Sequence, residues 1–201
     1  VMAKNLFPET IDKISNELTP MVATARLIKQ EHPDASVVFI GPCASKKLEA
    51  SRRTVRSDVD FVITFEELTG MFEAKGILLD EIKAMDEMKD ATAAGRGYGV
   101  AGGVANAIKE CIEQYYPGTP VNIQHAESLA ECKKALLLAK AGKMNGCLIE
   151  GMACPGGCIA GAGTNIAIPV AAKAVDKFKN EAEKKVPDES VDQEMVELEK
   201  E

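Results

Sequence analysis

The alternation of hydrophobic and polar residues predicts short strands separated by helices. Apolar runs rich in β-branched residues, at 36–40, 61–64, 121–124 and 147–149, are typical of buried strands. Apolar residues at helical spacing lie between these runs, and they predict helices over 6–18, 21–30, 66–75, 78–89, 104–115, 128–140 and 164–185, the last interrupted at Pro169. This order predicts an α/β fold with short, mostly parallel strands flanked by helices.

Length and composition favour a globular protein with its own core. The chain has 201 residues, 46% of them hydrophobic, which suits one large domain or two small lobes. We expect residues 1–186 to form this domain and residues 187–201 an acidic tail. The chain starts at Val1 and therefore looks cut from a longer protein.

The absence of a membrane-helix or signal-peptide pattern and the negative net charge limit the expected compartment and partners of this protein. No apolar run approaches the roughly 20 residues of a membrane helix, and no signal-peptide pattern precedes the first helix, so we expect a cytoplasmic protein without a membrane span. The formal net charge is −7, from 24 basic and 31 acidic residues, which argues against an extended nucleic-acid surface. In a reducing compartment the six cysteines are more often ligands or buried residues than disulfide partners.

The cysteines carry the candidate chemistry. Cys154 and Cys158 enclose Pro-Gly-Gly, and Cys43 follows an apolar run far upstream. Thiolates select zinc, copper(I) or iron–sulfur clusters, and the glycines let the backbone close on a bulky inorganic group. Three cysteines leave one position of a four-thiolate site unfilled. The remaining cysteines lie in predicted elements and are expected to be ordinary buried residues, and the histidines are expected at surface or capping positions: Cys111, Cys132, Cys147, His32 and His125.

Two further patterns have weaker implications. Basic residues crowd the segment after Cys43, and they form either a solvated loop or a positive patch near the site: Lys46, Lys47, Arg52, Arg53 and Arg56. Residues 97–102 match the glycine spacing of dinucleotide-binding turns, but no strand-like segment precedes them. For these glycines we therefore expect tight packing or close approach to a bulky group rather than nucleotide binding.

Four segments together resemble the iron-only (di-iron, FeFe) hydrogenases. Residues 42–49 and 152–158 closely resemble the second and third active-site signatures of that family, in the same order. Segments 58–64 and 98–104 are also similar, and the resemblance spans residues 8–163. It implies the C-terminal domain of the large subunit, which binds the H-cluster between two lobes, here without the first cysteine signature.

The resemblance implies an H-cluster, a four-iron, four-sulfur cube joined to a two-iron unit. Cys43, Cys154 and Cys158 would ligate the metal, with Cys158 also bridging to the two-iron unit. Lys46 would donate a hydrogen bond to a cyanide ligand of that unit. Lys46 and Cys158, together with Met152, would then be the catalytic residues.

Further cofactor contacts are implied by the same resemblance. Met152 would pack against the two-iron unit, and Tyr98 with neighbouring glycines such as Gly102 would close the cofactor wall. Ser15 lies near a position where the family has a proton-path serine, although it is equally well an exposed helical serine.

In the parent protein this site would convert two protons and two electrons to hydrogen reversibly, or would sense hydrogen. Ferredoxin or upstream ferredoxin-like domains would supply electrons. With three of four cube ligands, the chain by itself is expected to lack a complete cluster and activity. Gly41 and residues 161–165 depart from the common catalytic pattern, which favours a slower sensory module with a signalling partner.

Other classes remain open at this point. A non-catalytic iron–sulfur protein of the hydrogenase-like cluster-assembly group would bind a cube without the two-iron unit. A redox sensor would transmit the state of its cluster to a partner. A zinc module is the least favoured alternative.

Overall fold

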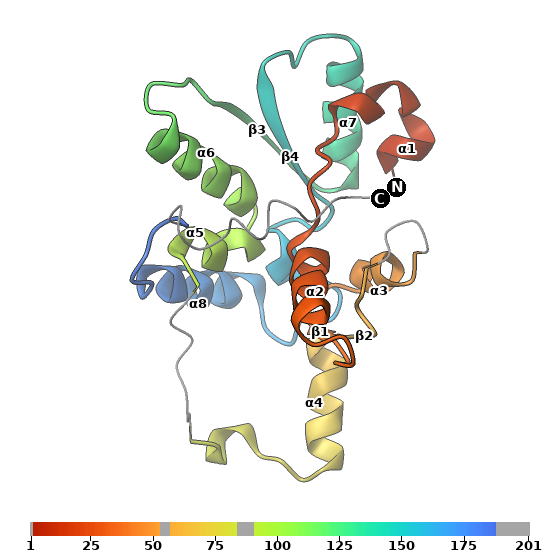
Figure 1. The fold of residues 1–201 in the computed structure, drawn as a ribbon, viewed down its shortest axis with the longest axis vertical. Helices are drawn as coiled ribbons and strands as arrows, with labels where there is room; N and C mark the ends of the chain where they lie inside the picture. The colour runs from red at the N-terminus through yellow and green to blue at the C-terminus, as the bar shows by residue number, and fades with distance from the viewer. Residues whose placement is uncertain (1, 53–56, 84–90, 188–201) are drawn as a thin grey trace. The chain divides into compact units, whose positions relative to one another are not determined.

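The computed structural model describes residues 2–52, 57–83 and 91–187. Its contacts separate the chain into two compact units, each with one two-stranded parallel sheet (Figure 1). Of the described residues, the β1–β2 unit contains 16–52, 57–83 and 161–165, and the β3–β4 unit contains 2–15, 91–160 and 166–187. The predicted α/β class with short parallel strands flanked by helices is therefore confirmed.

The β1–β2 unit is built on a core shared by its sheet and helix α2. Strand β1 (Val38–Ile40) pairs with β2 (Phe61–Ile63) in parallel register. The remaining elements are α2 (Pro20–Glu31), α3 (Ser45–Ala50), α4 (Phe65–Ala74) and the 3-10 helix η2 (Leu79–Glu81). Side chains of one sheet face, Phe39 and Val62, pack against buried Met21, Val22 and Ala25. Alternation along each strand places this face on the core.

Asp60 fixes the entry into this sheet. Its Oδ2 accepts a hydrogen bond from the backbone N–H of Val37, N to O 2.7 Å, and lies 3.0 Å from Lys29 Nζ. The Val37 hydrogen bond and then Lys29 lower the pKa of Asp60 in the folded chain. A carboxyl whose folded pKa is depressed stabilises the fold above its unfolded pKa, and this contribution is lost as pH falls through the folded pKa.

An Asp60→Asn variant is therefore expected to unfold at a lower temperature than the wild type at neutral pH. The difference should shrink as pH falls below about 4, the ordinary aspartate pKa, because protonation removes the same charge from the wild type. Thermal midpoints across this pH range measure the effect. Asp34→Asn, in an exposed loop, serves as the control, and a wild-type to Asp60→Asn gap that stays constant with pH would contradict the assignment.

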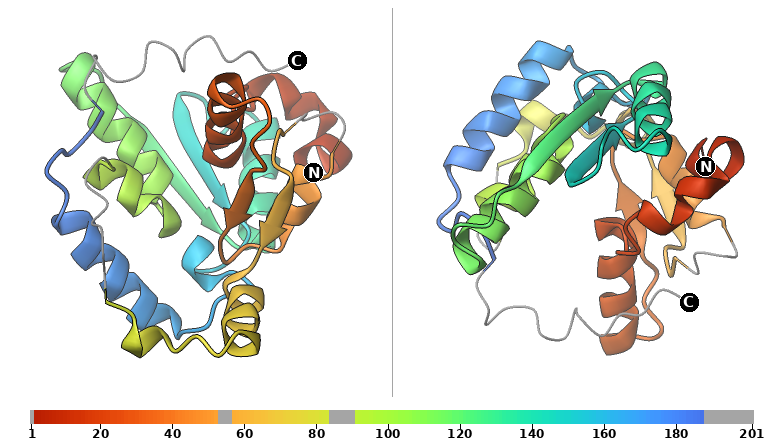
Figure 2. Two further views of the ribbon diagram at one scale, coloured as in Figure 1. Left: turned by 60° about the horizontal axis from the view of Figure 1, so that its bottom comes forward. Right: turned by 90° about the horizontal axis from the view of Figure 1, so that it is seen from above.

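The β3–β4 unit is organised around a longer parallel pair. Strand β3 (Asn122–Glu127) pairs with β4 (Cys147–Met152), from Asn122 opposite Cys147 to Glu127 opposite Met152. Figures 1 and 2 show α6 and α7 on opposite sides of this pair. Its helices are α1 (Met2–Leu6), η1 (Pro8–Lys13), α5 (Ala93–Arg96), η3 (Gly97–Gly99), α6 (Gly103–Tyr115), α7 (Leu129–Lys140), η4 (Cys158–Ala160) and α8 (Ile168–Asn180).

Several predicted helices are corrected by the structure. The helix over 6–18 is wrong: α1 ends at Leu6 and η1 begins at Pro8, whose ring fixes φ and has no N–H to donate to a preceding turn. Ser15 consequently lies outside any helix. The helix over 164–185 begins only at Ile168, because Pro169 suits a first helical turn and not a helix interior.

The helix predicted over 78–89 is also wrong where the structure describes it. Residues 78–83 contain only η2, and residues 84–89 lie outside the described part. Leu78, Leu79 and Ile82 are 56%, 58% and 56% exposed, so no buried surface supports an amphipathic helix there. Lys46 and Lys47, expected in a solvated loop or a positive patch, lie in α3.

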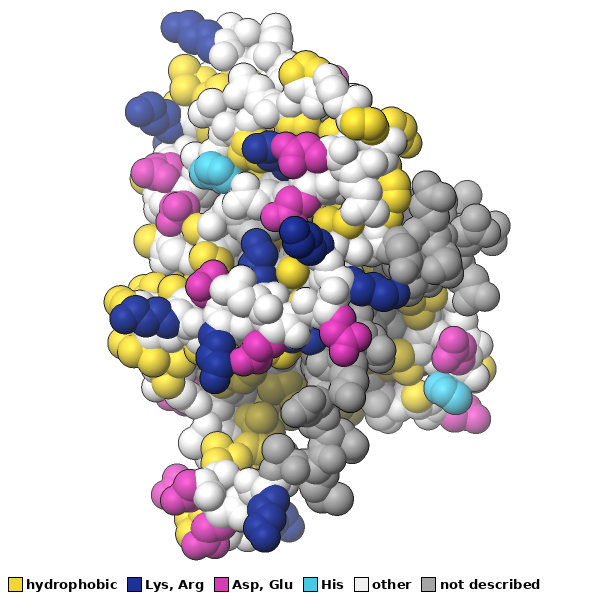
Figure 3. All heavy atoms as spheres, turned by 90° about the vertical axis from the view of Figure 1, so that its left-hand side faces the viewer, with side chains coloured by type: hydrophobic (Ala, Val, Ile, Leu, Met, Phe, Trp, Pro, Cys, Tyr) yellow, Lys and Arg dark blue, Asp and Glu magenta, His cyan; other side chains and the backbone are white. Residues whose placement is uncertain are grey.

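Charged side chains on the surface are of mixed sign. Figure 3 shows one face, on which Lys and Arg side chains are interspersed with Asp and Glu. Ion pairs join Lys109 with Glu113 along α6 and Lys179 of α8 with Glu110. A face of this kind presents no continuous positive track. Among the described helices, none combines the length and apolar character of a membrane span.

Candidate metal centre

Cys43 lies in the β1–β2 unit, in a turn directly after β1. Gly41 N donates to Ile63 O at 3.1 Å, which extends the strand pairing by one residue. Pro42 O accepts a hydrogen bond of 3.0 Å from Gly163 N. The half-buried Cys43 is therefore held between a sheet and the 161–165 segment, at the carboxyl end of a parallel strand.

Segment 161–165, expected to depart from the common catalytic pattern, is built into this unit. A Cβ added to Gly163 would lie 2.4 Å from the Cβ of Thr64, so only glycine fits there. Asn165 Nδ2 donates to Phe65 O at 3.2 Å and to Thr69 Oγ1 at 2.7 Å. Asn165 thus holds the first turns of α4.

The loop from Cys154 to Cys158 follows β4 and begins with a β-turn. Gly157 N donates to Cys154 O at 3.0 Å, with Pro155 and Gly156 at the central positions. Gly156 has φ +91° and Gly157 has φ +90°. A proline followed by a residue of positive φ is the pattern of a type II turn, which explains the Cys-Pro-Gly-Gly order.

Hydrogen bonds and close packing fix this loop in the β3–β4 unit. Gly156 N donates to Glu127 Oε2 at 3.0 Å, and Gly156 O accepts from Ala101 N at 3.1 Å. A Cβ on Gly157 would lie 2.4 Å from Ala101 N and 2.7 Å from the carbonyl carbon of Val100. The loop therefore rests directly on the 99–101 backbone.

The glycine turn itself is closed by packing and by a buried carboxylate. A Cβ on Gly103, the residue after the motif, would lie 2.0 Å from Gly97 O, whereas a Cβ on Gly97, Gly99 or Gly102 would come no nearer than 3.3 Å to its surroundings. The tightest packing is therefore at Gly103 and not at the glycines of residues 97–102. Glu150 accepts N–H bonds from Gly102, Val104 and Ala105, at 2.6, 3.0 and 3.1 Å. A nucleotide phosphate would need these same donors, and the carboxylate already takes them.

Sequence reasoning missed Glu150. The available signal was one acidic residue in an otherwise apolar strand, 147–152, which is an unusual place for a charge without a partner. His125, expected at a surface or capping position, is 41% exposed, and its Nδ1 lies 3.3 Å from Glu150 Oε2. It is thus the partner of a buried carboxylate.

Lys46 belongs to α3 of the β1–β2 unit. Its Nζ lies 2.7 Å from Glu49 Oε2, and the two side chains are 22% and 24% exposed. An ammonium carries three donors, so one ion pair leaves capacity for a further acceptor. The role of Lys46 toward a cofactor ligand stays a prediction.

Tyr98 and Met152 belong to the β3–β4 unit. Tyr98 packs against the cluster of Ala94, Ala107 and Val186, and burial, with a smaller effect of Cys111, raises the pKa of its hydroxyl. Met152 is the half-buried last residue of β4. Contact of either side chain with a cofactor stays a prediction.

Two of the other cysteines, Cys111 and Cys132, have environments that favour the neutral thiol. Burial raises the pKa of Cys111 in α6 and of Cys132 in α7, with smaller contributions from neighbouring glutamates. Cys147 accepts a hydrogen bond from Asn122 Nδ2 at 3.3 Å. All six cysteines are described, and none forms a disulfide. Thiolates are the ligating form, so raised pKa values disfavour Cys111 and Cys132 as ligands.

The predicted site residues are divided between the two units. Cys43 and Lys46 lie in the β1–β2 unit, and the β3–β4 unit contains the others: Tyr98, Gly102, Met152, Cys154 and Cys158. Within either unit, over the described residues, no group of three His, Cys, Asp or Glu side chains is arranged to hold a metal ion. The convergence of Cys43 with the later pair stays a prediction.

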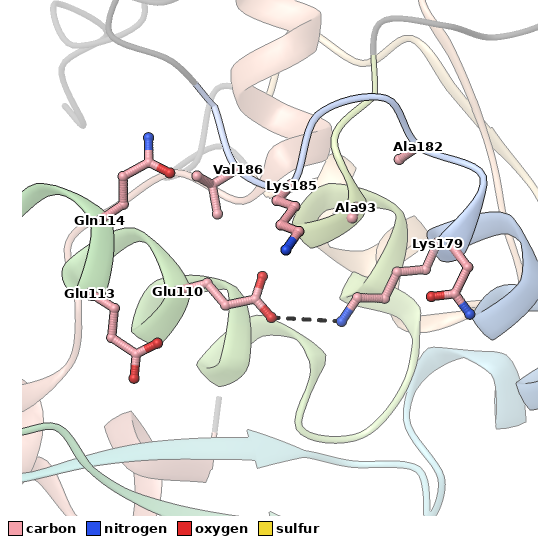
Figure 4. Close-up of a pocket in the computed structure, with 9 residues that line it drawn as sticks. Ala93, Glu110, Glu113, Gln114, Lys179, Ala182, Lys185 and Val186 are labelled. Carbon is pink, nitrogen blue, oxygen red and sulfur yellow. Dashed lines mark ion pairs between the residues drawn. The ribbon is translucent and has the colours of Figure 1, made fainter.

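A pocket of about 490 Å³ lies elsewhere in the β3–β4 unit. Figure 4 shows Glu110 and Lys179 pointing toward each other across it, 3.7 Å apart. Its lining includes Lys185 and Val186 but no cysteine. This pocket is therefore separate from the cysteine loop.

Cys43 and the Cys-Pro-Gly-Gly-Cys loop thus follow the carboxyl ends of parallel strands in an α/β fold. Residues 1–162 match the family described as iron only hydrogenase large subunit, C-terminal domain. The chain belongs to this family.

Curated relatives share part of their length with the chain. The periplasmic iron hydrogenase large subunit of Nitratidesulfovibrio vulgaris is 27% identical over 87% of this chain and 51% of its own length. Iron hydrogenase 1 of Clostridium pasteurianum is 26% identical over 80% of this chain and 35% of its own length. The chain thus spans about half of the first relative and a third of the second.

Solved structures show the same fold. The FeFe-hydrogenase HydA(deltaEFG), described in terms of stepwise H-cluster assembly, has a TM-score of 0.68 and 21% identity, over 92% of this chain and 65% of that chain. A variant of HydA1 from Chlamydomonas reinhardtii has a TM-score of 0.63 and 20% identity, over 92% and 65% of the two chains. At this identity the likeness establishes the fold alone.

Proposed function

We propose that the chain is the cluster-binding part of an iron-only hydrogenase, with Cys43, Cys154 and Cys158 as thiolate ligands. The observation that carries the proposal is the cysteine turn at a strand end in each unit, on a chain whose residues 1–162 match the hydrogenase domain. The parent protein would interconvert two protons and two electrons with hydrogen. Ferredoxin or ferredoxin-like domains would deliver the electrons, in the cytoplasm.

The donor set fits an iron–sulfur group. The three predicted ligands are cysteines outside disulfides, and thiolate sulfur is the preferred ligand of iron–sulfur clusters. The two loop cysteines enclose Pro155, Gly156 and Gly157, and glycines let the backbone close on a bulky inorganic group. When bound, the H-cluster would supply the electron storage and the site at which protons and electrons combine.

The chain's own residues would hold and shield that group. The turn contacts of Gly156 with Glu127 and Ala101 fix the backbone between the two loop ligands. Lys46 would donate a charge-assisted hydrogen bond to an anionic ligand. Met152, a soft and adaptable side chain, would exclude water beside it.

Anaerobic reconstitution tests the proposal. The chain handled in air is expected to contain no complete cluster, because exposed iron–sulfur sites with few thiolates oxidise readily. After incubation with iron, sulfide and reductant it should bind iron and acid-labile sulfide in equal amounts, and lose both in air. Iron bound without sulfide, or zinc bound in preference, would overturn the assignment.

A second candidate is supported by one further relative. The cytosolic Fe-S cluster assembly factor NAR1 of Kluyveromyces lactis is 39% identical over 69 residues, 34% of this chain and 15% of that protein. A chain of that kind would bind a cube without a two-iron unit. Hydrogen turnover after loading with a two-iron cofactor would decide for the hydrogenase, whereas a sensory module would turn over slowly.

A further inference from the structure

The buried carboxylate of Glu150 lies outside the proposed ligand set. Its side chain is 7% exposed, and its two oxygens accept the N–H bonds of Gly102, Val104 and Ala105. Backbone N–H groups at a helix N-terminus have no intrahelical acceptor, and the helix dipole favours a negative charge beside them. Glu150 therefore anchors the start of α6 from a neighbouring strand.

This anchor is connected to the cysteine loop through two short steps. Gly102 has φ +83°, so any residue with a Cβ would be strained at this position. The preceding residue, Ala101, donates its backbone N–H to Gly156 O at 3.1 Å. Gly157 packs on the same stretch of backbone, with its hypothetical Cβ 2.4 Å from Ala101 N. A displacement of Gly102 would therefore move the surface on which the loop rests.

Strand pairing fixes the position of the carboxylate itself. Glu150 lies opposite His125 in the parallel register, and Glu127 lies opposite Met152. His125 Nδ1 is 3.3 Å from Glu150 Oε2, and Glu127 Oε2 accepts the N–H of Gly156. The two carboxylates thus hold the glycine turn and the cysteine loop from the same pair of strands.

We propose that Glu150 is a positioning residue that sets the conformation of the Cys154 to Cys158 loop through the N-terminus of α6. The inference rests on the proposed function only in treating these two cysteines as ligands. Replacing the carboxylate by an amide places an NH₂ donor against backbone N–H donors. The turn at 99–102 then loses hydrogen bonds that hold it in place. The loop that rests on this turn becomes more mobile, and the solvent accessibility of the Cys154 and Cys158 thiols changes.

Site-resolved alkylation of the chain without cluster tests this proposal. The reduced 201-residue chain is pulsed with iodoacetamide under anaerobic conditions, and each cysteine peptide is quantified by mass spectrometry. In Glu150→Gln the labelling rates of Cys154 and Cys158 should change by about tenfold, the effect expected for losing charged hydrogen bonds. Cys43, in the other unit, should keep its wild-type rate. Glu113→Gln, an exposed carboxylate on α6 paired with Lys109, should leave every rate unchanged.

Two outcomes would overturn the proposal. One is unchanged labelling of Cys154 and Cys158, and the other is a uniform rise at all cysteines, which reports general destabilisation. If Glu150→Gln fails to fold, hydrogen exchange of the wild type decides. The amides of Gly102, Val104 and Ala105 should exchange at least about tenfold more slowly than in an unstructured chain, and exchange at unstructured rates would refute the anchor.

The alkylation result is independent of cluster binding. A selective change in Glu150→Gln, on a chain that binds no iron and sulfide, would support the positioning role and refute the proposed function. Binding of iron and sulfide by the wild type, together with no selective change in the labelling of Cys154 and Cys158 in Glu150→Gln, would support the proposed function and refute the positioning role. After reconstitution, Glu150→Gln is expected to contain less iron and sulfide than the wild type. This measurement connects the positioning role of Glu150 with the proposed cluster binding.

Discussion

Replacing Cys158 by serine is expected to remove nearly all of the iron and sulfide that the chain binds on anaerobic reconstitution. A serine hydroxyl keeps the shape of the side chain but is not ionised at neutral pH, whereas the ligating form of cysteine is the thiolate. Loss of one of three thiolates should reduce bound iron to about a tenth or less. Iron and acid-labile sulfide, measured per chain, give the result directly.

Cys147 provides the matched control. It lies half-buried in β4, hydrogen-bonded to Asn122, on the same strand that leads to the cysteine loop. Cys147→Ser should retain wild-type iron and sulfide. Cys43→Ser and Cys154→Ser should behave like Cys158→Ser. Equal retention in the Cys43 and Cys147 variants would remove Cys43 from the ligand set and restrict the site to the β3–β4 unit.

A Gly157→Ala substitution is expected to be the most damaging small change in the cysteine loop. The new Cβ would lie 2.4 Å from Ala101 N and 2.8 Å from Gly99 O, both backbone atoms that cannot rotate away. Strain from the positive φ adds about 1 kcal/mol or more, and forced backbone shifts add about 1–3 kcal/mol. A total near 3 kcal/mol would lower the unfolding midpoint by about 10 °C in a chain of this size.

Gly118→Ala separates the strain of a positive φ from the steric clash of the new Cβ with the backbone. Gly118 has φ +85°, close to the +90° of Gly157, but a Cβ there would meet nothing within 4 Å. It should therefore show only the strain of the positive φ, about 1–2 kcal/mol, and should leave iron and sulfide binding intact. Thermal unfolding and cluster content of both variants provide the comparison. Equal destabilisation would mean that close packing of the loop on the 99–101 backbone contributes nothing.

The strands and most helices were predictable because their signals are local. Runs such as 36–40 and 61–64 are apolar and β-branched, and each strand of the structure lies within or directly extends its predicted run. The cysteine loop was predictable for the same reason, since Pro155 and Gly156 encode a turn by their own backbone preferences. The family resemblance rested on these same short segments, and residues 1–162 match the hydrogenase domain.

One incorrect helix prediction concerns a segment whose outcome depends on distant surfaces. The pattern over 78–83 has helical spacing, but its leucines remain exposed and only a short 3-10 helix forms. An isolated helix of that length is marginal in water without a surface to pack on. The partners of Lys46 and Asn165 likewise followed from the folded chain, because a charge or an amide can pair with many neighbours of similar energy.

The sequence by itself determined the α/β pattern, the turn at each cysteine and the family, because periodicity, glycine and proline act over a few residues. Tertiary structure alone decided that Glu150 accepts the N–H groups of Gly102, Val104 and Ala105, 45 to 48 residues away. A buried carboxylate is stable only where several donors meet it, and those donors become neighbours only when β4 and α6 pack together.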